Sequence, residues 1–384
     1  MACLATLGPA VAILAAPARA EDPPTNRELY ELYQRQQEQI DATADAVDDA
    51  NRATGEGSGR WFEKTRLGGY GEIHFNFLDG GNGAKNKSEA DFHRFVLFIN
   101  HEYSDKIRMF SEIEIEHAFS GSDAPGEVEL EQAFIEFDLP HAITATGGLF
   151  LVPVGILNET HEPPTFYGVE RNPVEKYIVP TSWWEGGGML SQKFDHGIST
   201  NLAVTTGLHT DPTAFSIRNG RQKVAKADAS DVAITGRVVY RGVPGLELAV
   251  SAQWSENIAA TGAKTAATLF ETHVVYERGP FGMRALYARW DLHSSAAKAL
   301  GKDVQYGFYL EPSYRICDWL GVFGRYNQFN TTAGNAGGTQ RQYDIGFNFW
   351  PHENVVLKID GQFQHNQGGA AELDGVNLGL GFSF

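Results

Sequence analysis

Cysteine is nearly missing from this sequence of 384 residues, which holds only Cys3 and Cys317. A framework of disulfide bonds, which stabilises many small secreted domains, is therefore excluded. Long hydrophobic runs are also missing, because only residues 2–18 approach the roughly 18 apolar residues of a membrane-spanning helix. Basic residues are few: 31 Lys and Arg stand against 48 Asp and Glu, a net charge of −17. Such an acidic chain is a poor partner for nucleic acid, and we expect none.

The apolar run at residues 2–18 is followed by an Ala-Arg-Ala sequence at 18–20, which matches an A-x-A cleavage signal. This pattern predicts a secretory signal peptide at residues 1–20. The alternative is an apolar helix retained in the mature protein, but Pro9 and Pro17 interrupt the run. We therefore expect an exported protein.

Residues 21–54 have a different pattern from the rest of the chain. Thr25 and Glu28 have the spacing of a helix capping box. A heptad spacing follows at Leu29, Tyr33, Gln36, Ile40, Thr43, Val47 and Ala50. The pattern predicts a periplasmic helix that forms a short coiled coil, although a solvated lone helix would show it too. Residues 55–65, which include the run "GEGSG", are predicted to be a linker.

From residue 66 onward, apolar and polar residues alternate with a period of two, which is typical of strands with one apolar and one polar face. Leu246, Leu248 and Val250, for example, alternate with Glu247 and Ser251. The alternation predicts sixteen strands, at residues 67–78, 91–103, 106–119, 128–139, 142–152, 186–194, 197–208, 230–241, 246–257, 267–278, 281–292, 303–314, 317–328, 340–350, 354–365 and 373–384. Most of these runs exceed the length of about 9–11 residues with which a tilted strand crosses a bilayer.

The connections between these runs alternate between short turns and long loops. The turn at 279–280 has the sequence Gly-Pro, whereas the loops at 79–90 and 209–229 are long. An even number of strands with this alternation is typical of outer-membrane barrels. We therefore predict an all-β transmembrane barrel of 16 antiparallel strands over residues 66–384, in contact with the lipid of a bacterial outer membrane. The strand at 373–384 would pair with the first strand, so that no backbone edge is left unpaired in the membrane.

The longest connection, at residues 153–185, contains Trp183, Trp184 and five prolines, a composition that does not suit a disordered segment. Loops of this length are usually functional. We interpret it as an extracellular loop that folds into the barrel and forms a constriction. Two alternatives are a rigid cap outside the barrel and a latch onto a neighbouring subunit.

The parity of the strands predicts which charged side chains line the pore. Acidic candidates gather on neighbouring strands and in the long loop, and basic candidates lie across the barrel. The candidate pore-lining and constriction residues are Glu112, Glu114, Glu129, Glu131, Glu159, Glu162, Arg171, Arg237, Arg289, Arg325 and Lys358. Such an arrangement would set a transverse field across the pore. Alternatively, the charges only keep the lumen hydrated.

Signals for catalysis and for metal binding are weak. Ser182 and His161 are the nearest candidates for a nucleophile and a base, and the sequence contains no Gly-x-Ser-x-Gly elbow. His161 with Glu159 and Glu162, or His273 with Glu271, could ligate an ion, but no recurring ligand set appears. We expect no catalytic residue, no metal site and no cofactor.

Several stretches resemble the phosphate-selective porin O and P family. They are "GLFLVPVGILNETHEPPTFYGVERNP" at 148–173, "LEQAFIEFDLP" at 130–140 and "GGYGEIHFNF" at 68–77. The resemblance implies a trimeric outer-membrane channel with sixteen strands per subunit, and several members of the family carry an N-terminal periplasmic helix. Its anion-selective members line the lumen with Arg and Lys, whereas acids outnumber bases here. Phosphate selectivity is therefore not carried over to this chain.

The sequence as a whole predicts an outer-membrane porin that passes small hydrophilic, charged solutes through a water-filled channel. The alternative is a barrel with a structural role, in which the helix at residues 21–54 tethers the membrane to a partner. A barrel enzyme is a third alternative for the same residues.

Overall fold

The computed structural model describes residues 61–121 and 123–384. The predicted signal peptide, the predicted helix at 21–54 and most of the predicted linker lie outside these residues. At the end of the linker, Trp61–Lys64 form a 3-10 helix, η1, and the first strand begins at Thr65. In the part of the chain that the structure describes, no helix is long and apolar enough to cross a membrane.

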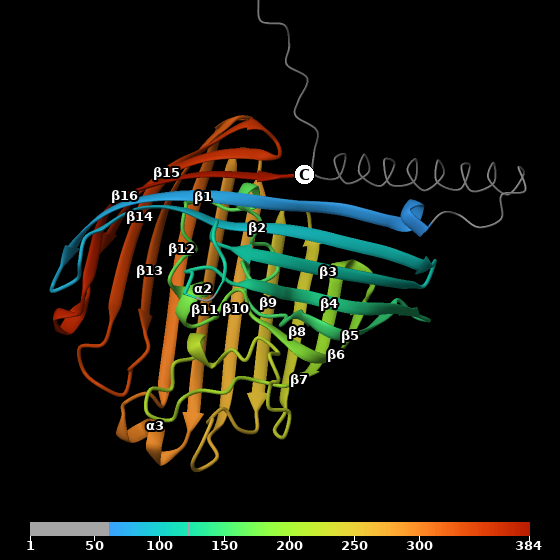
Figure 1. Ribbon diagram of the computed structural model, residues 1–384, viewed down its shortest axis with the longest axis horizontal. Coiled ribbons are helices and arrows are strands. Elements are labelled where there is room, and N and C mark those ends of the chain that lie inside the picture. Colours follow the sequence, from blue (N-terminus) through green and yellow to red (C-terminus); the bar gives the residue numbers. More distant parts are fainter. Residues whose placement is uncertain (1–60, 122) are drawn as a thin grey trace, which may run out of the picture. The chain divides into compact units, whose positions relative to one another are not determined.

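Sixteen antiparallel strands form one closed barrel, as the alternation predicted (Figure 1). They are β1 (Thr65–Gly81), β2 (Lys87–Ser104), β3 (Ile107–Glu116), β4 (Val128–Leu139), β5 (Ile143–Leu151), β6 (Trp184–Lys193), β7 (Ile198–Thr205), β8 (Ala233–Val243), β9 (Leu246–Ser255), β10 (Ala266–Arg278), β11 (Phe281–His293), β12 (Val304–Cys317), β13 (Leu320–Asn330), β14 (Gln340–His352), β15 (Val355–Gln364) and β16 (Glu372–Ser383). Each strand overlaps its predicted run, so the predicted strand number and order are confirmed.

The barrel closes through the pairing of β1 with β16. The register runs from Tyr70 opposite Ser383 to Gly81 opposite Glu372. Beyond the end of β16, the backbone groups of Phe384 and Gly69 exchange two hydrogen bonds of 2.9 Å. The pairing leaves neither the first nor the last strand with a free edge, which is the condition for a sheet to lie in lipid.

The two faces of β16 show the predicted alternation. Val376, Leu378 and Leu380 are exposed on the outer face. Asn377 lies between them in sequence, is buried, and donates a hydrogen bond of 3.0 Å to Asp360 of β15. Because side chains alternate along a strand, the apolar row faces outward and the amide faces the interior.

The connections are short at one end of the barrel and mostly long at the other. The long ones include residues 117–127, 152–183 and 206–232, which we call L2, L3 and L4. The first connection is shorter than predicted, since β1 and β2 extend to Gly81 and from Lys87. Short helical segments lie in the connections: η2 (Pro163–Thr165), α2 (Val174–Tyr177), η3 (Asp195–Gly197), η4 (Arg218–Gly220), α3 (Ser295–Ala299) and η5 (Gln367–Gly369).

A β-bulge interrupts the pairing of β3 with β4. Glu112 lies opposite Gln132, whereas the next residue, Ile113, lies opposite Leu130. Glu131 is therefore the extra residue of the bulge. Both Glu131 and Gln132 reach side chains of the barrel interior, because a bulge breaks the strict alternation of faces.

Candidate functional site in the barrel interior

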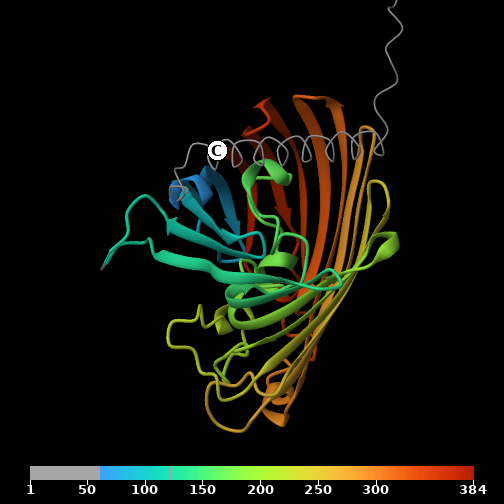
Figure 2. The same ribbon diagram turned by 90° about the vertical axis from the view of Figure 1, so that its right-hand side faces the viewer.

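L3 crosses the interior of the barrel. It begins after β5 and ends before β6, yet its backbone contacts side chains from strands far around the barrel. Lys358 of β15 donates a hydrogen bond of 2.8 Å to the carbonyl of Gly168, and Trp290 of β11 donates one of 2.9 Å to the carbonyl of Ile178. Figure 1 labels the turn of α2, which belongs to L3, and Figure 2 shows green turns of this part of the chain among the strands.

One side of L3 is docked on the inner wall by apolar packing. Residues of L3, of L4 and of strands β10 to β13 form a buried cluster that includes Val154, Ile156, Val174, Ile178, Val179, Trp183, Phe215, Ala288, Trp290, Tyr309 and Phe329. The rings of Trp183 and Trp290 lie 6.1 Å apart. Each fully buried large apolar side chain stabilises such packing by about 1.5–3 kcal/mol. The inner wall is therefore apolar where the loop covers it.

A buried carboxylate, Glu175 of α2, organises the start of L3. Its Oε1 accepts hydrogen bonds of 2.7 Å from the backbone amides of Ile156 and Leu157. Its Oε2 accepts one of 2.8 Å from the hydroxyl of Tyr309 in β12. Burial raises the pKa of the Glu175 carboxyl, and these donors oppose the shift. Gly155 has a φ of +83°, and a Cβ there would lie 2.8 Å from Oε1 of Glu175.

Glu175 is not among the predicted site residues, although the sequence contains a signal for it. Asn172 precedes it by three residues, and the amide of Glu175 donates a hydrogen bond of 2.8 Å to Oδ1 of Asn172. The Asn172 side chain donates one of 3.2 Å back to Oε2. This reciprocal pattern has the Asn-x-x-Glu spacing of a helix start. The pattern could have identified a structured turn inside the long loop.

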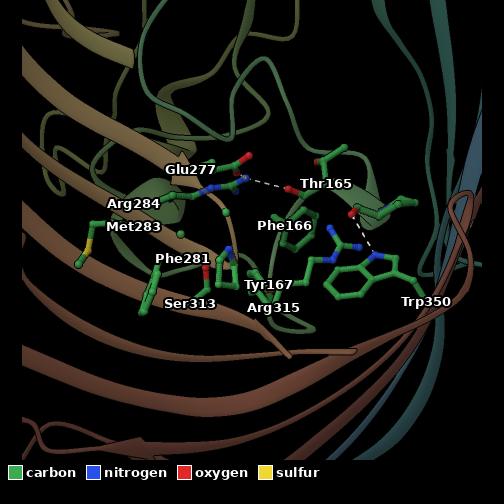
Figure 3. Close-up of a pocket in the computed structure, with 14 residues that line it drawn as sticks. Thr165, Phe166, Tyr167, Glu277, Phe281, Met283, Arg284, Ser313, Arg315 and Trp350 are labelled. Carbon is green, nitrogen blue, oxygen red and sulfur yellow. Dashed lines mark hydrogen bonds and ion pairs between the residues drawn. The ribbon is translucent and has the colours of Figure 1, made fainter. Parts of the chain in front are cut away.

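The middle of L3, at residues 164–167, reaches the short-turn end of the barrel, where it lines a hollow of about 160 Å³ (Figure 3). Arg284 of β11 donates a hydrogen bond of 2.8 Å to the carbonyl of Thr165. Trp350 of β14 donates one of 3.3 Å to the carbonyl of Pro164. On β16, a Cβ at Gly381 would lie 2.3 Å from Pro163, so only glycine permits this approach.

A second hollow, of about 280 Å³, lies toward the long-loop end and is lined by polar residues of L3 and of the last strands. Glu170, Arg171 and Lys176 contribute charged groups from L3, and Gln342 and Gln362 contribute amides from β14 and β15. The arrangement leaves polar space on both sides of the loop.

The predicted acidic residues of β3 and β4 lie on the inner face of the barrel. Glu112, Glu114 and Glu131 are each at most 3% exposed. Glu114 lies directly opposite Glu129 in the pairing of β3 with β4. These carboxylates form an acidic wall on two neighbouring strands.

L4 supplies bases to this wall and to L3, and strand parity could not point to them. Lys223 forms ion pairs with Glu127 and Glu129. Arg218 donates hydrogen bonds to the L3 carbonyls of Lys176, at 3.2 Å, and Thr181, at 2.8 Å. Burial, and then the nearby Arg221, lowers the pKa of Arg218 to about 10, so it remains cationic at neutral pH. The run "RNGRQK" at 218–223 was the available signal.

The predicted bases of the far wall have partners of their own. Arg325 forms ion pairs of 3.0 Å with Glu311 and 2.9 Å with Asp344. Lys358 contacts L3, where its Nζ lies 3.5 Å from the ring centre of Phe166. These two side chains lie in the interior, where they hold L3 and neighbouring strands together.

The remaining predicted residues fall in different places. Arg237 of β8 forms a two-point ion pair with Glu159 of L3. Arg171 donates a hydrogen bond of 3.1 Å to the hydroxyl of Ser182. Glu162 lines a hollow beside the end of β16.

The predicted inward position of Arg289 is wrong. In β11 its neighbours Ala288 and Trp290 are buried against L3. Arg289 points to the opposite, outer face, where it forms an ion pair of 2.6 Å with Asp291. The parity was misread because the inner face of β11 is apolar beneath L3.

Ser182 and His161, the candidates for catalysis, have different partners in the structure, whereas His273 and Glu271, which were considered for metal binding, are in contact. The Ser182 hydroxyl accepts its hydrogen bond from Arg171, whereas His161 lies beside Glu112 and Glu131, at 3.7 and 3.6 Å. His273 contacts Glu271 at 2.7 Å and also Glu247 at 3.1 Å.

Comparison with solved structures identifies the fold. The outer-membrane channel DcaP of Acinetobacter baumannii matches with a TM-score of 0.59 and 14% identity over 83% of this chain and 97% of that one. The anion-selective porin of Comamonas acidovorans matches with a TM-score of 0.60 and 13% identity over 83% and 99%. OprB of Pseudomonas putida matches with a TM-score of 0.58 and 11% identity over 84% and 94%. The chain has the porin fold.

Sequence comparison gives less information about this chain than structural comparison does. No protein-family description matches the chain. An uncharacterized protein of Aquifex aeolicus (strain VF5) is 28% identical over 338 residues, which are 77% of this chain and 74% of that protein.

Proposed function

We propose that the protein is an outer-membrane porin, a water-filled channel for small hydrophilic and charged solutes, with L3 as its constriction. The observation that carries the proposal is the closed barrel of sixteen strands, with apolar residues outside and polar residues inside. Barrels of this size enclose more space than the side chains of the wall fill. The porin fold of the neighbours supports the same function and a bacterial outer-membrane location.

The crossing of the interior by L3 supports its role as the constriction. Hollows lie on both of its sides, and Glu170, Arg171 and Lys176 of L3 bring charged groups to one of them. Charges in a narrow passage with walls of low dielectric constant focus the field and sort solutes by charge.

A homotrimer is part of the proposal, supported by the family resemblance and by a neighbour, OmpT of Vibrio cholerae, that was solved in a trimer form. The resemblance to the phosphate-selective family remains a prediction.

The first test of this function is electrical. The refolded protein, added to a planar lipid bilayer, is expected to raise the current in discrete steps of uniform size. Heat-denatured protein from the same preparation serves as the control. A folded preparation that inserts into the bilayer but carries no current would exclude a diffusion channel.

Charge selectivity provides a second, finer prediction. Lys223→Gln removes the ammonium that neutralises Glu127 and Glu129, so the mouth becomes more negative. One unit charge about 8 Å from a permeating ion in water changes its energy by about 0.5 kcal/mol, or about twofold in permeability ratio. The reversal potential in a salt gradient is expected to shift toward cation preference by that factor.

Lys298→Gln is the matched control, because Lys298 is exposed on α3 in a different loop. It changes the net charge equally and is expected to leave the reversal potential unchanged. Equal shifts in both variants would mean that the contact of L2 with L4 does not border the ion path.

A further inference from the structure

Three side chains from three separate segments lie close together where L3 contacts β3 and β4. They are Glu112 of β3, Glu131 of the bulge in β4, and His161 of L3. One ligand-type atom of each lies within 4.8 Å of the others. All three residues are at most 3% exposed. Glu131 is the extra residue of the bulge, next to Gln132, which lies opposite Glu112.

Several of the polar atoms there lack hydrogen-bond partners, whereas Oε1 of Glu112 accepts a hydrogen bond of 3.4 Å from the hydroxyl of Tyr70. Among the described residues, neither ring nitrogen of His161 has a partner, and Oε2 of Glu131 and Oε2 of Glu114 have none. Buried polar atoms are normally paired, because leaving one unpaired costs about 1–3 kcal/mol. The unpaired imidazole lies beside unpaired carboxylate oxygens. We therefore expect a bound ion or molecule that contacts these atoms together.

The charge balance points to a cation. Two buried carboxylates, those of Glu112 and Glu131, lie beside His161, and a third, that of Glu114, is buried on the same strand as Glu112. The guanidinium of Arg94 is bound to a fourth, Glu72, at 2.6 Å, and also donates to the carbonyl of His161. The acids thus exceed the fixed cations. Buried charges of one sign require compensation by pairing or by a metal.

We propose that Glu112, Glu131 and His161 bind a divalent transition-metal ion such as Zn²⁺, which joins L3 to the β3–β4 wall. One imidazole with carboxylate oxygens is a donor set that zinc accepts. Ligands at about 2.0–2.1 Å from a tetrahedral ion lie about 3.3–3.4 Å from one another. Nε2 of His161 lies 3.7 Å from Glu112 and 3.6 Å from Glu131, beyond hydrogen-bond length and close to this spacing.

The second group of acids in the acidic wall provides a contrast. Glu116, Glu127 and Glu129 also lie close enough together to hold an ion. There, however, the Lys223 ammonium occupies the position of a cation and pairs with Glu127 and Glu129. No histidine takes part in that group. A metal is expected at the first group and not at the second.

The proposed ion also has a structural consequence. Glu112 and Glu131 belong to the barrel wall, whereas His161 belongs to the loop that we propose as the constriction. Binding of the ion to the folded arrangement therefore stabilises the docked position of L3 by linkage. This consequence rests on the proposed function, but the binding of the metal does not.

The test measures metal directly on the full-length protein in detergent. The protein is stripped with a chelator, dialysed against Zn²⁺, and its metal content is measured by elemental mass spectrometry. One zinc per chain is expected. Substitution with Co²⁺ is expected to give the visible absorption bands of a tetrahedral site.

His161→Ala and Glu131→Gln are each expected to weaken Zn²⁺ binding by about 100-fold or more, since even indirect partners of a ligand change affinity by about 10–100-fold. Glu127→Gln, in the group occupied by Lys223, is the control and is expected to bind zinc normally. Resistance to unfolding in detergent without heating confirms that each variant is folded.

Two results would overturn the proposal. One is a folded wild-type protein that retains no zinc above background, in which case His161 is only a protonated partner of the carboxylates. The other is unchanged binding in folded His161→Ala, which would place the metal elsewhere. The metal content decides this question whether or not the channel conducts, so failure of the metal site can be told apart from failure of the proposed function.

Discussion

Replacing Trp290 by alanine is expected to release L3 from the inner wall of the barrel. The indole is fully buried, packs against Trp183, and donates a hydrogen bond to the carbonyl of Ile178. Removing a buried Trp side chain costs about 3–5 kcal/mol. The strand ladder of the barrel does not depend on this contact, so the loss is expected to fall on the docking of L3.

Limited trypsin digestion reports this release. L3 contains Arg171 and Lys176, which are partly covered in the docked loop. Cleavage at these two positions is expected to become at least about 100-fold faster in Trp290→Ala, because about 3 kcal/mol corresponds to a factor of more than about 100 in the open population. In bilayers, the same variant is expected to show a larger and noisier conductance.

Trp254→Ala is the matched control for this experiment. Trp254 lies on the outer face of β9 and is 43% exposed. Its removal deletes the same side chain from the barrel without touching L3, so the cleavage rate of L3 is expected to stay at the wild-type value. A Trp290→Ala barrel that is folded yet cleaved no faster than this control would show that the apolar cluster does not hold L3.

Replacing Glu175 by alanine is expected to have the next largest effect. The change leaves the amides of Ile156 and Leu157 and the hydroxyl of Tyr309 without their acceptor. Each unpaired buried group costs about 1–3 kcal/mol. The total of at least about 3 kcal/mol is expected to release the turn of α2 from the first part of L3 and to increase trypsin cleavage at Arg171 and Lys176 about 100-fold.

Glu175→Gln separates the role of the shape of this side chain from the role of its charge. The amide keeps one oxygen for the two backbone donors but places an NH₂ group near Tyr309. An intermediate rate of cleavage is therefore expected. Glu159→Ala is the control, since Glu159 belongs to the same loop but pairs with Arg237 through a partly exposed side chain. If Glu175→Ala and Glu159→Ala behave alike, the buried carboxylate does not organise the loop.

The strand pattern could be predicted because the bilayer imposes it on each strand separately. Val376, Leu378 and Leu380 must face lipid wherever the rest of the chain lies, so the period of two appears in the sequence itself. The length and the aromatic content of L3 likewise identified it, from the sequence alone, as a structured loop. The buried positions of Glu112 and Glu131 follow from the same parity rule.

The rule failed where the interior is not aqueous. On β11, Ala288 and Trp290 face inward because L3 covers them, and Arg289 is turned outward. A sequence with apolar residues on both faces of a strand does not tell which face is inner. The partners of Arg325 and Lys358 were equally hidden, since they come from other strands and from the backbone of L3.

The sequence by itself determined the sixteen strands, their order, their alternating faces and the one long loop, because lipid and local geometry act on each segment alone. Only the tertiary structure decided which charges meet. L4 brings Lys223 to Glu127 and Glu129, and L3 brings His161 to Glu112 and Glu131. These encounters depend on closure of the barrel, on a one-residue bulge and on the path of two loops, and no local pattern encodes such distances.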